Sequence, residues 1–167
     1  MKKLFIIGLA LIGFSVHSFA QATATATASA NVISAITLAK VLDMNFGNIA
    51  VSSPGTVILA TNSTRTTTGG ITLPVVAGTV TAASFTVTGQ GTSTYAITLP
   101  SGTHTITRIS GVEAMGVSAF NSNPSGVGTL IAGTQNITVG AMLAASSGQV
   151  PGVYTNATGF NVTVNYN

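Results

Sequence analysis

The chain has 167 residues, of which 46% are hydrophobic and only 4% are charged. Five Lys and Arg stand against two Asp and Glu, so there are too few cations to line a surface that binds nucleic acid or an anionic membrane. The absence of cysteine removes disulfides, thiolate catalysis and Cys-based metal sites. The core and the hydrogen bonds of the fold must therefore supply all of the stability.

The first 20 residues have the three parts of a secretory signal peptide. Lys2 and Lys3 form a basic start, residues 4–16 form an apolar run, and residues 18–20 (Ser-Phe-Ala) place small side chains on both sides of the middle position before a cleavage site. The apolar run is shorter than the roughly 20 residues that cross a membrane. We therefore predict an exported bacterial protein, secreted or held at the cell surface, whose mature chain starts at Gln21 and has no membrane span.

The 147 residues that remain, 21–167, are enough for one domain. They carry three cations and two anions, which gives a formal charge of +1. Solubility must then rest on Thr, Ser and Asn, and such a surface suits a chain that packs against copies of itself. We divide this part into an N-terminal extension, residues 21–30, and a domain, residues 31–167.

The extension alternates alanine with threonine or serine and then continues into an apolar stretch. One interpretation is a tail that leads into the first strand, and the other is a donor strand that pairs with a neighbouring subunit. Each buried methyl contributes about 0.8 kcal/mol, whereas ordering the backbone costs about 1–2 kcal/mol per residue. A firm donor strand would therefore need the larger apolar residues as well, and the sequence leaves both interpretations open. The candidate donor residues are Ala22, Ala24, Ala26, Ala28, Ala30, Val32, Ile36 and Leu38.

The domain consists of short runs of alternating apolar residues separated by Gly, Pro and Ser turn signals, which predicts an all-β sandwich. Pro74 lies inside one run and predicts that this strand is an edge strand or ends early. The only helical candidate, residues 111–119, is also interpreted as a strand. The predicted runs include residues 57–59, 71–75, 85–87, 95–99 and 137–143.

The end of the chain carries the clearest strand pattern. Phe160, Val162, Val164 and Tyr166 alternate with Asn and Thr, so the four apolar residues share one face of the predicted strand. All four are aromatic or β-branched, the residue types that suit a pleated, half-buried surface. We take these four residues as the candidate C-terminal assembly strand.

Few residues offer chemistry, and each has a plainer interpretation. His104 has no second ligand or triad partner, so an exposed strand residue is expected. Asp43 and Glu113 satisfy a two-carboxylate pattern only by coincidence, and Asp43 is predicted to stabilise the turn at Phe-Gly. Gly126 and Gly128 lack the lysine and helix of a phosphate loop and are predicted to be turn glycines with positive φ. We therefore expect no enzyme activity, no catalytic or metal site and no cofactor.

Four motifs together resemble the secreted bacterial family called domain of unknown function 4402. They are residues 42–49 (Leu-Asp-Met-Asn-Phe-Gly-Asn-Ile), 123–130 with Gly-Thr-Gln at 133–135, 139–143 (Val-Gly-Ala-Met-Leu) and 159–166. The Phe-Gly turn and the Val-x-Val-x-Tyr ending are more distantly similar to spore-coat-U-like and chaperone–usher pilus subunits. That resemblance implies an immunoglobulin-like antiparallel β-sandwich that polymerises by strand exchange, with a periplasmic chaperone as a partner of the last strand.

These observations favour a structural subunit of an extracellular fibre, pilus or surface coat that associates with itself by β-strand addition. The alternative is an adhesive or carbohydrate-binding module on the same scaffold. Sugar binding usually employs exposed aromatic platforms, and this chain has no Trp and three Tyr. Tyr95 and Tyr166 share parity with apolar neighbours and are predicted to be core residues, which leaves only Tyr154 as a platform.

Overall fold

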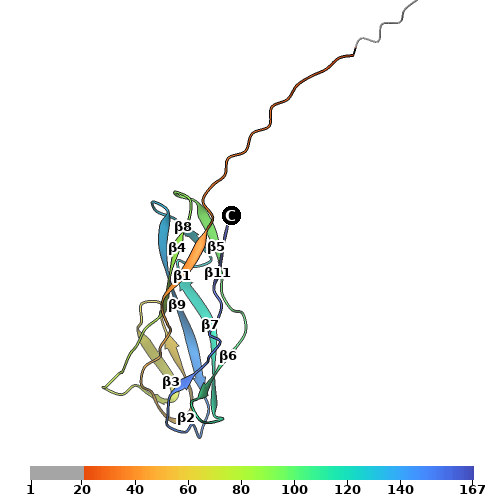
Figure 1. Ribbon diagram of the computed structural model, residues 1–167. Coiled ribbons are helices and arrows are strands. Elements are labelled where there is room, and N and C mark those ends of the chain that lie inside the picture. The colour runs from red at the N-terminus through yellow and green to blue at the C-terminus, as the bar shows by residue number, and fades with distance from the viewer. Residues whose placement is uncertain (1–20) are drawn as a thin grey trace, which may run out of the picture. The chain divides into compact units, whose positions relative to one another are not determined.

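The computed structural model describes residues 21–167 and is shown in Figure 1. The predicted signal peptide, residues 1–20, lies outside the described residues. Residues 21–32 form no strand, and every one of them is exposed. The compact unit is Ile33–Asn167, so its first residue lies close to the predicted domain start at residue 31.

The predicted all-β sandwich is confirmed, since the described residues contain strands and no helix. The immunoglobulin-like topology within that class stays a prediction. The strands are β1 (Thr37–Leu42), β2 (Ala50–Leu59), β3 (Arg65–Thr72), β4 (Ala83–Thr88), β5 (Thr94–Thr98), β6 (His104–Arg108), β7 (Ala114–Asn123), β8 (Val127–Thr129), β9 (Thr134–Ala145), β10 (Tyr154–Thr155) and β11 (Thr163–Tyr166).

The strands form two antiparallel sheets. The larger sheet has the order β1-β4-β9-β7-β6-β10, with β2 on β9 and β3 on β2, and the smaller sheet has the order β11-β5-β8. β9 organises the larger sheet because residues 134–139 pair with β4 and residues 141–145 pair with β2, while β7 pairs along the other edge. Its alternating residues from Ile137 to Ala145 are all buried, so one strand contributes to the core along most of its length.

The core has two parts. In the first, β4 and β9 of the larger sheet face β5 and β11 of the smaller one, and Tyr95, Val87 and Ile137 are completely buried between them. In the second, buried side chains of β2, β7 and β9 are covered by apolar residues of the segments 44–51 and 73–80. The first part is therefore a two-layer sandwich, and connecting segments close the second.

The Phe46-Gly47 motif is a structural turn that holds these covering segments. Gly47 has φ +66, and its N–H donates to Asn45 Oδ1 at 2.8 Å. The Arg65 guanidinium donates to the carbonyls of Phe46 and Asn48, and Asn48 N–H donates to Ala77 O at 2.7 Å. The prediction that Asp43 stabilises this turn is wrong, because Asn45 supplies the side-chain oxygen.

Three local predictions concern a proline, a short helical candidate and two glycines. β3 ends at Thr72, before Pro74, and among the described strands it pairs only with β2, as the proline predicts. The candidate at 111–119 is a strand from residue 114 onward, in β7. Gly126 has the predicted positive φ, but the prediction for Gly128 is wrong. Gly128 lies in β8, where an added Cβ would come within 2.3 Å of the Tyr95 ring, so close packing explains this glycine.

Candidate assembly site

Four of the charged side chains form two separate ion pairs. Lys40 Nζ donates to Asp43 Oδ1 at 2.7 Å on the surface, and Arg108 Nε donates to Glu113 Oε2 at 2.7 Å across the β6–β7 turn. The Arg108 hydrogen bond holds the pKa of the Glu113 carboxyl below its usual value. Within residues 21–167, no three His, Asp or Glu side chains gather in a way that would hold a metal ion.

His104 begins β6, but the prediction that it is exposed is wrong, because its ring is half-buried edge-on against Phe120 with centroids 5.5 Å apart. Tyr95 is a core residue as predicted, and burial raises the pKa of its hydroxyl. Tyr154 donates its hydroxyl to Val150 O at 2.7 Å in the neighbouring loop. Tyr95 is therefore closed to a sugar, and the Tyr154 ring is half-buried against the other part of the core.

The most distinctive surface is the side of the sandwich where both sheets end. β1 is the edge strand of the larger sheet, and β11 is the edge strand of the smaller sheet. The two strands are neighbours in space, yet no ladder joins them in the described part of the chain. Figure 1 shows the C-terminus at the same end of the sandwich as the start of β1. We call the border between β1 and β11, where each strand has a free edge, the terminal seam.

Apolar side chains from both strands line the terminal seam on its core side. Ile36 and Leu38 come from the β1 side, and Val162 and Tyr166 come from the β11 side, all four half-buried against the first core cluster. Val164 lies between them and is buried. Free backbone edges beside a floor of incompletely buried apolar side chains are features that an added strand would satisfy.

The hydroxyl of Tyr166 closes one end of the terminal seam. It donates to Ser34 O at 2.9 Å and accepts from Gln90 N–H at 2.6 Å, while Ser34 N–H donates to Gln90 Oε1 at 3.3 Å. Gly89 makes room for this hydroxyl, since an added Cβ would lie 2.3 Å from it. Three segments that are distant in the sequence thus meet at one side chain.

The predicted C-terminal strand is confirmed for residues 163–166 and is wrong for Phe160 and Val162, which pair with no strand. The reason lies in the partner strand. β5 ends at Thr98, and Pro100 has no N–H to continue the ladder, so the chain opposite Asn161 turns away towards β6. Phe160 and Val162 still point towards the core, packed against the first cluster as their parity predicts.

The candidate donor residues are divided between two environments. Leu38 pairs with Val87 of β4 in its own sandwich, and Ile36 packs against the same core. Both therefore belong to the wall of the terminal seam. The alanines from Ala22 to Ala30, together with Val32, lie in the exposed stretch that forms no strand. Whether that stretch is donated stays a prediction, and it is the part of the donor segment that the sandwich does not use.

Among the described residues, no helix has the length and apolarity required to cross a membrane. Comparison with known proteins gives one match, a family model described as "Domain of unknown function (DUF4402)", over residues 36–166. No curated protein and no solved structure matches the chain.

Proposed function

We propose that this chain, which belongs to the DUF4402 family, is a secreted structural subunit of an extracellular fibre, pilus or surface coat that associates by β-strand addition. The observation that carries the proposal is the terminal seam. Two free strand edges border it, and half-buried apolar side chains from Ile36 to Tyr166 line its floor. An incoming strand would gain hydrogen bonds from a free edge and cover the apolar floor.

The occupant is residues 21–32 of a second copy. This stretch forms no strand of its own, and its alanines recur at every second residue. In an extended strand they would all face the floor, while the hydroxyls of Thr and Ser would face solvent. At about 3.3 Å per residue, residues 22–30 would extend about 30 Å, which exceeds the length of β1. The stretch is therefore long enough to fill the seam.

A second copy is favoured over the chain's own extension because of Ser34. Its N–H donates to Gln90 Oε1, and its carbonyl accepts from Tyr166. A reversal between residues 31 and 36 would have to break these bonds to lay the extension beside β1. No Gly or Pro lies in that stretch to form a tight turn.

Magnitudes show which contacts decide the association. Five alanine methyls contribute about 4 kcal/mol, and about eight ladder bonds contribute roughly 8 kcal/mol. Ordering nine residues costs on the order of 13 kcal/mol, so the favourable and unfavourable contributions of the extension nearly cancel. Completing the burial of the half-exposed floor adds about 1 kcal/mol for each large side chain. The floor of the seam therefore tips the balance towards docking.

Export and chaperone use are part of the same proposal. A chain with an open seam and a free extension would associate wherever it accumulates, so assembly outside the cytoplasm suits the predicted signal peptide. A periplasmic chaperone that lends a strand to the seam would prevent early association. This supports a homo-oligomeric fibre as the final state.

The test compares two triple variants of equal charge on opposite faces of the extension. The Ala variant (Ala24→Asp, Ala26→Asp and Ala28→Asp) would put three carboxylates against the floor. The Thr variant (Thr23→Asp, Thr25→Asp and Thr27→Asp) would put three carboxylates in solvent. We expect size-exclusion chromatography and negative-stain microscopy to show assemblies for the wild type and the Thr variant, and monomers for the Ala variant. Equal assembly by both variants, or a monomeric wild type at high concentration, contradicts the proposal.

A further inference from the structure

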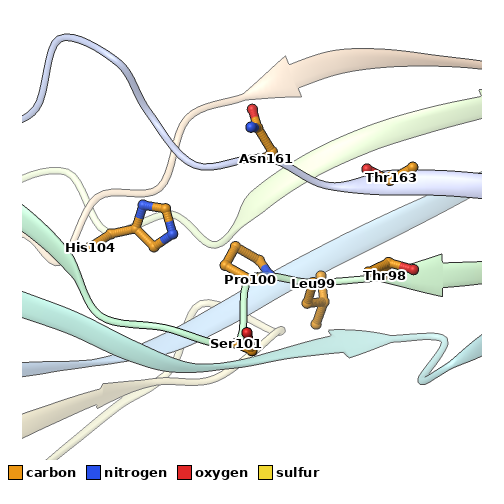
Figure 2. A pocket seen from close by; sticks show the side chains of 7 residues that line it. All are labelled: Thr98, Leu99, Pro100, Ser101, His104, Asn161 and Thr163. Atoms are coloured by element: carbon orange, nitrogen blue, oxygen red, sulfur yellow. The ribbon is translucent and has the colours of Figure 1, made fainter.

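A shallow, open cavity of about 310 Å³ lies where β5 and the segment before β11 separate. The last ladder pair between them is Thr98 with Thr163, after which the chain at Pro100 leaves towards β6. Figure 2 shows the His104 ring at one side of this cavity, opposite Pro100 and Asn161. The cavity is on the opposite edge of β11 from the terminal seam, because β5 pairs with that edge.

Five polar side chains line the cavity, and four of them are exposed, so their donors and acceptors are open to solvent and to a ligand. Within residues 21–167, no hydrogen bond joins any of them to another protein group, and the neighbouring backbone of Leu99 and Asn161 takes part in no ladder. An imidazole, a carboxamide and three hydroxyls together offer both donors and acceptors. The five are Thr98, Ser101, His104, Asn161 and Thr163.

The imidazole is held in place by apolar packing. The His104 ring meets Phe120 at an interplanar angle of 89°, and Phe120 in turn packs on Phe160 with centroids 4.9 Å apart. This aromatic row fixes the imidazole from behind while the ring borders the cavity. Leu99 and Pro100 supply an apolar wall. The cavity therefore combines a fixed polar group with an apolar surface, as small-ligand sites do.

The lining contains no Lys, Arg, Asp or Glu, so it offers no formal charge to an ionic ligand. Its volume is at the lower end of the range for ligand pockets, which is about 300–1,000 Å³. We propose that this cavity binds a neutral polyhydroxylated ligand the size of a single saccharide residue. The ring hydroxyls would bond to the five polar side chains, and the C–H face would contact Leu99 and Pro100.

This site is independent of strand addition, because the side chains that line it come from the end of β5, the β5–β6 connection, the start of β6 and outward positions before and in β11. A subunit can therefore carry the ligand site whether or not it polymerises. In an assembled fibre the cavity would be repeated once per copy, so that weak sites act together on a glycan-bearing surface.

The test is saturation-transfer NMR on the full chain with four neutral monosaccharides as probes: glucose, galactose, mannose and N-acetylglucosamine. The method reads the ligand signal, so it works on monomers and on large assemblies alike. We expect a saturable signal from at least one probe with a Kd in the millimolar range, typical of so small a ligand. Absence of saturable binding for all four probes overturns the proposal.

A matched pair of variants locates the binding. Asn161→Ala removes the carboxamide that borders the cavity, and Asn165→Ala removes an exposed carboxamide outside the cavity lining, two positions from Thr163. We expect Asn161→Ala to weaken binding by about tenfold, the loss expected for a ligand hydrogen bond of ordinary strength, and Asn165→Ala to leave it unchanged. Equal binding by both variants shows that the sugar lies elsewhere and overturns the assignment.

Discussion

Tyr166→Phe tests whether one hydroxyl holds the end of the terminal seam together. The variant keeps the ring and removes two hydrogen bonds, the one donated to Ser34 O and the one accepted from Gln90 N–H. Each bond is worth about 0.5–1.5 kcal/mol net, and both partners lie at exposed residues where water can replace the hydroxyl. We therefore expect unfolding to become easier by about 1–2 kcal/mol. For a unit of this size that lowers Tm by roughly 3–10 °C.

The matched control is Tyr154→Phe, which also removes one hydroxyl from a half-buried tyrosine. Within residues 21–167 its hydroxyl bonds only to Val150 O, four residues earlier in the chain, so we expect a loss below about 0.5 kcal/mol. Urea denaturation of both variants, monitored by circular dichroism, gives the two free energies directly. Should Tyr166→Phe be no less stable than the control, the hydroxyl joins three segments without holding them. That result would refute a stabilising role for the Tyr166 hydroxyl at the end of the seam.

Three further changes test the packing and the electrostatics. Gly128→Ala should lose about 2–4 kcal/mol in urea denaturation because its Cβ would meet the Tyr95 ring, whereas Gly102→Ala, with open space around it, should change stability little. The free energy of unfolding should fall as pH rises above about 10, the pKa of tyrosine in the unfolded chain. The reason is that burial raises the pKa of Tyr95, so the folded state keeps a proton that the unfolded state loses. Denaturation between about pH 8 and 11 should show a smaller fall for Tyr95→Phe. Arg65→Met should lose about 2–3 kcal/mol because two backbone carbonyls of the Phe46-Gly47 turn lose a charged donor, and a loss below about 0.5 kcal/mol would contradict that role.

Strand identity could be predicted from the sequence because period-two alternation coincides with burial. The clearest case is β9, where every second residue from Ile137 to Ala145 is buried. Pro74 likewise predicted where β3 ends, since the missing N–H acts locally. Both features depend on residues that are close together in the chain, so the sequence alone is enough to predict them.

Features that depend on a distant partner could not be predicted in this way. Phe160 and Val162 continue the alternation of β11, but their ladder stops because Pro100 ends β5, sixty residues earlier in the sequence. Gly128 looks like a turn residue until the Tyr95 ring is placed above it. The terminal seam is of the same kind, because only the sheet order brings the edges of the first and last strands together.

Charged side chains protect little of the terminal seam. Soluble β-proteins commonly protect edge strands with charged residues, especially lysine, because a bare edge pairs with other chains. β1 carries one such residue, Lys40, near its C-terminal end, where it pairs with Asp43. β11 carries none along its whole length. The uncharged part of the seam therefore consists of residues 37–39 of β1 and all of β11. It lies beside the end that Tyr166 closes. Residues 21–167 hold only five charged side chains, so most of this surface is uncharged, and nothing on this part of the seam opposes the proposed strand addition.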